Sequence, residues 1–114
     1  MRRVLLALCL LPLPLHAEGL ATAKDLRAAI IGNTVEGSMM ASGGYAEFYA
    51  PDGSIHGKDY DGRWSFDGDR MCFAYGEDPP ACWGAEIRGG KVVWMGASGE
   101  EGSGTIRAGN PSGW

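Results

Sequence analysis

The amino-acid sequence predicts a mainly β fold, a small up-and-down antiparallel meander or barrel of about 7–8 short strands with one short N-terminal helix and one disulfide. Three observations predict it. Apolar residues recur at every second position, as in Trp64 and Phe66 or Met71 and Phe73, which is the period of a strand. All 19 glycines lie after residue 17 without a fixed period, as turn residues would. Two cysteines flank a loop that contains a Pro-Pro pair.

Residues 1–17 have the pattern of a secretory signal peptide, and residues 18–114 that of a single all-β domain. Two arginines precede an apolar run from Val4 to Leu15, which is shorter than the roughly 20 residues that a membrane span needs. Cleavage after Ala17 leaves two cysteines, an even number that fits one disulfide in an oxidising compartment. We therefore expect a periplasmic or secreted protein with no transmembrane segment in the mature chain.

The charge of the mature chain limits its partners. After residue 17, eight Lys and Arg stand against fourteen Asp and Glu, a net charge near −6. Nucleic acids and anionic membrane surfaces both require clustered positive charge. The composition therefore argues against binding to nucleic acid or to an anionic membrane surface, and no motif indicates a cofactor or a metal site.

The first element after the cleavage site is a helix, expected at about 23–31. Thr22 with Asp25 three positions later is an N-cap signal, Leu26 and Ile30 lie on one apolar stripe, and Gly32 is a stop signal. We expect this helix to pack on a sheet edge or to cap one end of a barrel.

From residue 33 onward the period changes to that of strands. The expected strands are 33–39, 44–50, 54–59, 63–66, 70–75, 82–88, 91–96 and 104–108. Sequential neighbours should pair, and closure is favoured because an open sheet would expose one edge. The expected inward set, large enough to fill the barrel completely, is Phe48, Ile55, Trp64, Phe66, Met71, Phe73, Tyr75, Trp83, Ile87, Val92, Trp94 and Ile106.

The two cysteines are placed to pair across one hairpin. If the apolar residues of both strands face the core, Cys72 and Cys82 point to the opposite face and lie on the same side of the sheet. Pro79 and Pro80 mark the loop between them, because proline does not fit a central strand. The sequence therefore predicts a Cys72–Cys82 disulfide.

The candidates for chemistry are few. His56 has Asp52, Asp59 and Asp61 within a few residues, so it is either a general base or metal ligand, or an exposed strand residue among turn acids. The aspartates near 59–69 either bind calcium loosely or serve as turn residues, and the sequence does not decide between these alternatives.

Three segments carry a resemblance to known proteins. GNTVEG from Gly32, then GYAEFYAPDGSIHG and DGRWSFDGDRMCFAYGEDPPACWG, together resemble a family of small secreted alphaproteobacterial proteins with no assigned function. The resemblance implies export and a compact disulfide-closed fold, and it implies no active site. The Gly62-Arg63-Trp64 step also looks like the glycine-x-tryptophan that opens a strand in lipocalin-type barrels.

Three functions are compatible with these observations. The first is a non-catalytic periplasmic or secreted β domain that binds a protein or envelope partner through exposed aromatic and basic side chains. The second is a lipocalin-like carrier whose barrel mouth, lined by Trp64, Trp94 and Tyr75, holds a small apolar ligand. The third is a hydrolase-like enzyme that uses His56 with Asp52 or Asp59. The expected contact residues for the first function are Tyr45, Tyr49, His56, Tyr60, Arg63 and Trp114.

Overall fold

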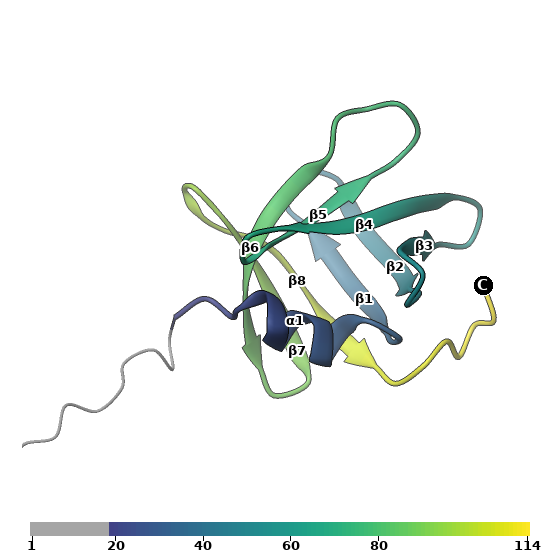
Figure 1. Cartoon of the computed structure of the whole chain (residues 1–114), viewed down its shortest axis with the longest axis horizontal. Coiled ribbons are helices and arrows are strands. Elements are labelled where there is room, and N and C mark those ends of the chain that lie inside the picture. Colours follow the sequence, from purple (N-terminus) through teal and green to yellow (C-terminus); the bar gives the residue numbers. More distant parts are fainter. Residues whose placement is uncertain (1–18) are drawn as a thin grey trace, which may run out of the picture.

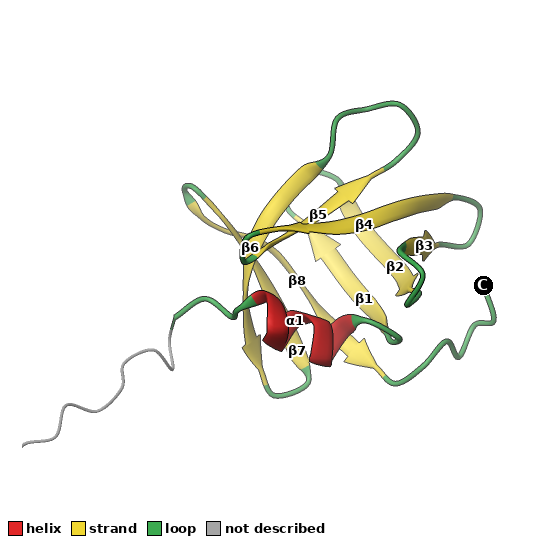
Figure 2. Cartoon of the chain, viewed as in Figure 1, coloured by secondary structure: helices red, strands yellow, loops and turns green. Residues whose placement is uncertain are grey.

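Eight antiparallel strands close into a barrel in which each strand pairs with its sequence neighbours and β8 pairs with β1 (Figures 1 and 2). The structure is a computed structural model that describes residues 19–114, so the predicted signal peptide lies outside the described residues. The elements are α1 (Ala23–Ile30), β1 (Thr34–Met39), β2 (Gly43–Tyr49), β3 (Ser54–His56), β4 (Asp61–Asp67), β5 (Arg70–Ala74), β6 (Ala81–Arg88), β7 (Lys91–Gly96) and β8 (Gly99–Arg107). The predicted fold class is thereby confirmed.

Helix α1 covers one end of the barrel. It begins with the predicted capping box, in which Thr22 and Asp25 exchange side-chain and backbone hydrogen bonds of 3.2 and 3.3 Å. The backbone N–H of Ala23 donates to Oδ1 of Asp69, in the β4–β5 turn, at 2.8 Å. This bond, together with apolar packing against the interior, holds the helix across the strand ends.

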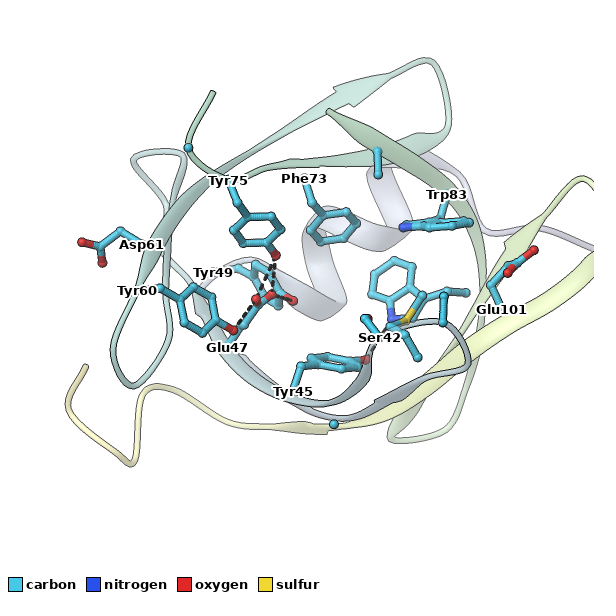
Figure 3. Close-up of a pocket in the computed structure, with 16 residues that line it drawn as sticks. Ser42, Tyr45, Glu47, Tyr49, Tyr60, Asp61, Phe73, Tyr75, Trp83 and Glu101 are labelled. Atoms are coloured by element: carbon cyan, nitrogen blue, oxygen red, sulfur yellow. Dashed lines mark hydrogen bonds between the residues drawn. The ribbon is translucent and has the colours of Figure 1, made fainter. Parts of the chain in front are cut away.

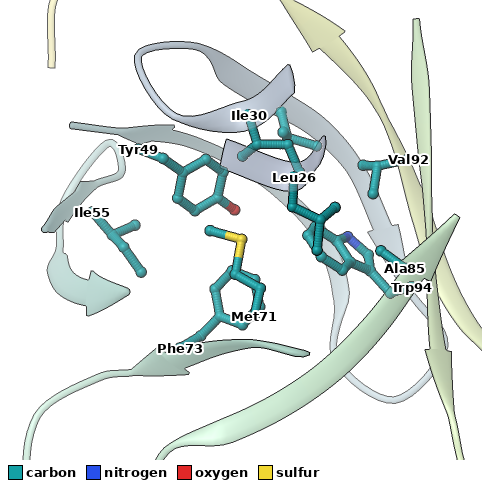
Figure 4. Close-up of a cluster of buried hydrophobic side chains, with 10 residues drawn as sticks. Leu26, Ile30, Tyr49, Ile55, Met71, Phe73, Ala85, Val92 and Trp94 are labelled. Atoms are coloured by element: carbon teal, nitrogen blue, oxygen red, sulfur yellow. The ribbon is translucent and has the colours of Figure 1, made fainter. Parts of the chain in front are cut away.

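The apolar core lies beneath this helix (Figure 4). Leu26 and Ile30 of α1 have no exposed surface and pack into the barrel. Burial of side chains of this size contributes roughly 1.5–3 kcal/mol each. The buried residues of this core cluster are Leu26, Ile30, Val35, Tyr49, Ile55, Met71, Phe73, Ala85, Val92 and Trp94. This end of the barrel is therefore closed and well packed.

The predicted disulfide is present. Cys72 of β5 and Cys82 of β6 stand directly opposite each other in the antiparallel register and are bonded. Their separation in sequence is ten residues, so the bond closes the β5–β6 hairpin as expected.

The prediction for residues 44–50 was wrong about which face is buried. Phe48, expected inside, lies outside and stacks on His56 with ring centroids 6.3 Å apart. Tyr45, Glu47 and Tyr49 point inward in its place, and Tyr49 is only 1% exposed. A shift of one residue turns every side chain of a strand to the other face. The inward placement of Glu47 is stable because hydrogen bonds satisfy its carboxylate, as described below.

Two further expectations need correction. The last strand begins at Gly99, ahead of the expected 104–108, and includes the two consecutive glutamates that follow. The large inward side chains do not fill the barrel either, because they crowd the α1 end and leave a cavity at the other. Trp64 belongs to the crowded end: its Nε1 donates to the Ala50 carbonyl at 2.8 Å, and the Arg27 guanidinium lies 5.5 Å from its ring centroid.

Candidate functional site

The barrel end opposite α1 contains a cavity of about 730 Å³ that opens to solvent (Figure 3). It lies between the inward faces of β1, β2 and β5–β8 and the loops that join them at this end. Seven aromatic side chains contribute to its wall: Tyr45, Tyr49, Tyr60, Phe73, Tyr75, Trp83 and Trp94. Both the volume and the aromatic lining are typical of a small-molecule site.

A single carboxylate organises one side of the cavity. Glu47, in the middle of β2, is 5% exposed. Its Oε1 accepts hydrogen bonds from the hydroxyls of Tyr49 at 2.7 Å and Tyr75 at 2.9 Å. Its Oε2 accepts from Tyr60 at 2.6 Å and again from Tyr75 at 2.8 Å, so three tyrosines from different parts of the chain converge on one acid (Figure 3).

This arrangement fixes the protonation of the tyrosines. Burial, followed by the negative charge of Glu47, raises the pKa of Tyr49 and Tyr75 well above its ordinary value. Burial and the hydrogen bond to Glu47 likewise raise the pKa of Tyr60. The hydroxyls therefore remain donors, which the carboxylate requires, since an ionised carboxylate has only acceptors. Hydrogen bonds to a charged acceptor are roughly twice as strong as neutral ones.

Three glycines set the positions of three of the cavity tyrosines. A Cβ on Gly57 would lie 2.4 Å from the ring of Tyr60, and one on Gly62 would lie 2.6 Å from the ring of Tyr75. A Cβ on Gly104 would likewise meet the hydroxyl of Tyr45 at 2.6 Å. Because no side chain occupies these places, each tyrosine packs directly against the backbone of a neighbouring segment. The aromatic wall is therefore held by the barrel itself.

The opposite side of the cavity has its own polar contact. The indole Nε1 of Trp94 donates to the hydroxyl of Tyr45 at 2.9 Å, and that hydroxyl donates to the Ser103 carbonyl at 3.2 Å. The ring of Phe73 meets Trp94 edge to face, with centroids 5.3 Å apart. Since these polar groups are paired with one another, the surface that this side presents to the cavity is mainly aromatic.

The charges around the cavity are of one sign. Of the sixteen described residues that line it, three are acidic and none is Lys, Arg or His. Glu47 lies inside, Glu101 lies at the rim, and Asp61 lies at another point of the rim with its carboxylate turned away from the cavity (Figure 3). The site is thus a negatively charged aromatic cavity.

His56 lies outside the barrel, in a different network. Its Nδ1 is 3.0 Å from Oδ1 of Asp61, and its Nε2 is 2.9 Å from Oγ of Ser54. The hydrogen-bonded order Ser54, His56, Asp61 resembles that of a hydrolytic triad. Its aspartate is Asp61, whereas the sequence suggested Asp52 or Asp59. Ser54, however, donates its hydroxyl proton to Asp52, so that proton is directed away from the histidine. The hydroxyl and backbone N–H of Ser54 also lower the pKa of Asp52. This geometry does not activate the serine.

The structure does not bring the predicted contact residues together on one surface. Tyr45 and Tyr49 are inside the barrel, and Tyr60 is at its rim. His56 and Arg63 belong to the neighbouring strands β3 and β4, and neither lines the cavity. Trp114 lies in the C-terminal tail, where its backbone is bonded to the Asn110 side chain. Of the residues expected at the mouth of a carrier, Trp94 and Tyr75 line the cavity and Trp64 does not.

Three of the four aspartates between residues 59 and 69, which were considered for calcium, have protein partners. Asp67 pairs with Arg70 at 3.1 Å, Asp69 caps α1, and Asp61 contacts His56. Within residues 19–114, no group of three or more His, Cys, Asp or Glu side chains is placed to hold a metal ion. Asp61, Asp67 and Asp69 therefore already contact other groups of the protein in the described structure.

Glu47 is the site residue that the sequence reasoning missed. The signal that could have found it is the order Tyr45-Ala-Glu47-Phe-Tyr49, in which two tyrosines share the period-two face of the acid. A charged residue on an inward face is expected only when it is paired, and the partners Tyr60 and Tyr75 are distant in sequence. The local pattern alone therefore favoured Phe48 as the buried residue.

In the described part of the chain, no helix has the length and apolar character needed to cross a membrane. Comparison with protein-family models, curated proteins and solved structures finds no match, so the resemblance to small secreted alphaproteobacterial proteins stays a prediction.

Proposed function

We propose that this protein is a non-catalytic, exported carrier that binds a small, largely apolar ligand in the mouth of its barrel. The observation that carries the proposal is the cavity of about 730 Å³ with seven aromatic side chains in its wall. Ligand sites in proteins have volumes of about 300–1,000 Å³ and combine apolar walls with a few fixed polar groups. A β domain of this size with a solid interior would not support a carrier.

The rigidity of the wall also supports binding. The rings of Tyr60 and Tyr75 pack against Gly57 and Gly62, and their hydroxyls are hydrogen-bonded, so little side-chain entropy remains to be lost when a ligand enters. A preorganised site retains more of its contact energy as affinity. We favour this function over binding of a protein partner, since the residues expected to form a partner surface are divided between the interior, the rim, the outer face and the tail.

Titration with N-phenyl-1-naphthylamine, a neutral dye that fluoresces in apolar surroundings, tests the proposal. We expect saturable binding to the mature, oxidised protein with one site per chain. Quenching of intrinsic fluorescence should accompany it, because Trp83 and Trp94 line the cavity.

A matched pair of variants locates the site. Ser42 is an exposed residue of the cavity rim, and Ser65 is an exposed residue of β4 that does not line the cavity. Ser42→Trp should block the mouth and weaken dye binding at least about tenfold, whereas Ser65→Trp should bind as the wild type does. Absence of saturable binding to the wild type, or equal weakening by both variants, would exclude the cavity as a carrier site.

A further inference from the structure

We propose that the ligand is an organic cation, an alkylated ammonium group on an aromatic or aliphatic body, with its charge held beside Glu47 and the surrounding rings. This inference rests on the proposed function and adds the chemical class of the ligand. Three features of the cavity carry it: the sign of its charge, the character of its wall and the state of its carboxylate.

The first feature is an uncompensated negative charge. Glu47 is 5% exposed, and none of its hydrogen-bond partners is cationic. None of the described lining residues is a base; of the two further acids, Glu101 lies at the rim, and the carboxylate of Asp61 is turned away toward His56. In surroundings of low dielectric constant a charge acts more strongly than in water, so an anionic ligand is repelled and a cationic ligand is attracted. The acidic mature chain gives the same preference at long range.

The second feature is the aromatic wall. Tyr60 and Tyr75 stand edge to face with centroids 5.9 Å apart, beside the carboxylate that both contact. Tyr45 and Trp83 contribute further rings to the same cavity. Faces of aromatic rings attract cations, and sites for quaternary ammonium groups are built from several such rings. A neutral apolar ligand would gain the apolar contact with the rings but not the attraction between a cation and the ring faces.

The third feature selects among cations. The two oxygens of Glu47 already accept the hydroxyl protons of three tyrosines, and Tyr75 lies within hydrogen-bond distance of both oxygens, so each oxygen contacts two hydroxyls. A small, strongly hydrated cation would have to displace these hydroxyls to coordinate the oxygens. An alkylated ammonium group needs no hydrogen bond, since it interacts through charge and ring contact. The site therefore suits a bulky, weakly hydrated cation.

A pair of isosteres separates charge from shape. (3-Hydroxyphenyl)trimethylammonium and 3-tert-butylphenol have nearly the same shape and differ in the central atom of the branched group, so calorimetric titration of each measures the effect of the charge. We expect the wild-type protein to bind the cation at least about tenfold more tightly, which is within the range of a desolvated cation–π contact.

A matched pair of Glu→Gln variants assigns this preference to a residue. Glu47→Gln should reduce the affinity ratio of cation to isostere to about twofold or less. Glu36→Gln removes the same charge from the outer face of β1, where Glu36 pairs with Arg107, and should leave the ratio unchanged. If Glu47→Gln does not fold, nuclear Overhauser contacts from the N-methyl protons of the bound cation locate the ammonium group in the wild-type protein. Contacts to the rings of Tyr60 and Tyr75 support the assignment, and contacts confined to exposed Leu20 or Met40 overturn it.

The outcomes distinguish this inference from the proposed function. If 3-tert-butylphenol and the neutral dye bind but the cation binds no more tightly than its isostere, the inference is overturned and the carrier function stands. If neither isostere nor the dye binds, the carrier function fails and the inference fails with it. A tenfold preference that survives in Glu47→Gln would overturn the role of the carboxylate.

Discussion

The two ends of the barrel are built differently from the same strands. At the α1 end, Leu26, Ile30 and Met71 have no exposed surface and pack as an apolar plug. At the mouth, tyrosines surround a carboxylate and leave about 730 Å³ unfilled. Strand β5 contributes Met71 to the plug and Phe73 to the cavity wall. The apolar end therefore supplies the stability that allows the other end to retain a buried acid and an unfilled cavity.

The plug should be the part of the molecule most sensitive to truncation. Leu26→Ala removes a fully buried side chain between α1 and the barrel, and we expect it to lower the free energy of unfolding by about 3–4 kcal/mol. Urea denaturation followed by circular dichroism measures the loss. Met40→Ala, at a residue 71% exposed in the β1–β2 loop of the mouth, is the control and should change stability by less than about 0.5 kcal/mol. Equal losses in the two variants would contradict the comparison.

The disulfide should stabilise the mouth end of the barrel, because it closes the β5–β6 hairpin, whose loop lies at the mouth. Replacing both cysteines by alanine should destabilise the protein by about 3 kcal/mol, because the unfolded chain regains the entropy of an open loop of this length. Denaturation of the oxidised protein and of the double variant measures the difference. Alkylation with mass detection is the control: native protein that takes up two labels at Cys72 and Cys82 would show that the bond does not form.

The tyrosine–glutamate network should contribute less than either of these. Glu47→Gln replaces charge-assisted hydrogen bonds by neutral ones and places an amide donor against a hydroxyl donor, so we expect a loss of about 1–2 kcal/mol. The measurement is again denaturation in urea, with Glu36→Gln as the matched surface control, for which a loss below about 0.5 kcal/mol is expected. A Glu47→Gln variant as stable as the wild type would show that the network is not stabilising.

The same network predicts a response to alkaline pH. The pKa values of Tyr45, Tyr49, Tyr60 and Tyr75, which are all the tyrosines of the chain, are raised, chiefly by burial. Below about pH 10 both states keep these protons, so stability is unaffected; above it the unfolded chain releases protons that the folded state retains, and stability falls. The folded protein should therefore show little tyrosinate absorbance at pH 10.5, whereas the chain in 8 M urea should titrate near pH 10. Ionisation of two or more tyrosines in the folded protein at pH 10 would contradict the geometry.

Local patterns were sufficient for the helix that covers the closed end and for the disulfide. The capping box at Thr22, the stripe of Leu26 and Ile30 and the pairing of the two cysteines all depend on residues near one another in sequence. The mouth depends on distant residues, since Glu47 becomes acceptable inside only where Tyr60 and Tyr75 converge on it. The cavity was also not predictable, because the pattern tells which face a large side chain occupies but not at which end of the barrel it packs. Trp64 shows this: it faces the barrel, as expected, yet it packs beside α1 and not at the mouth.

The smallest effect is expected on the outer face, at His56. Its contacts with Asp61 and Ser54 lie at the surface of the barrel, and surface contacts of this kind contribute at most about 1 kcal/mol. His56→Ala should therefore lower stability by less than about 1 kcal/mol and should leave the affinity for N-phenyl-1-naphthylamine within about twofold of the wild type, because the histidine does not line the cavity. Dye titration and urea denaturation of the same preparation check both values. If His56→Ala loses most of its affinity for the dye while the fold stays intact, contacts on the outer face of β3 must influence the cavity. The outer face would then be a third region of the molecule, energetically coupled to the mouth.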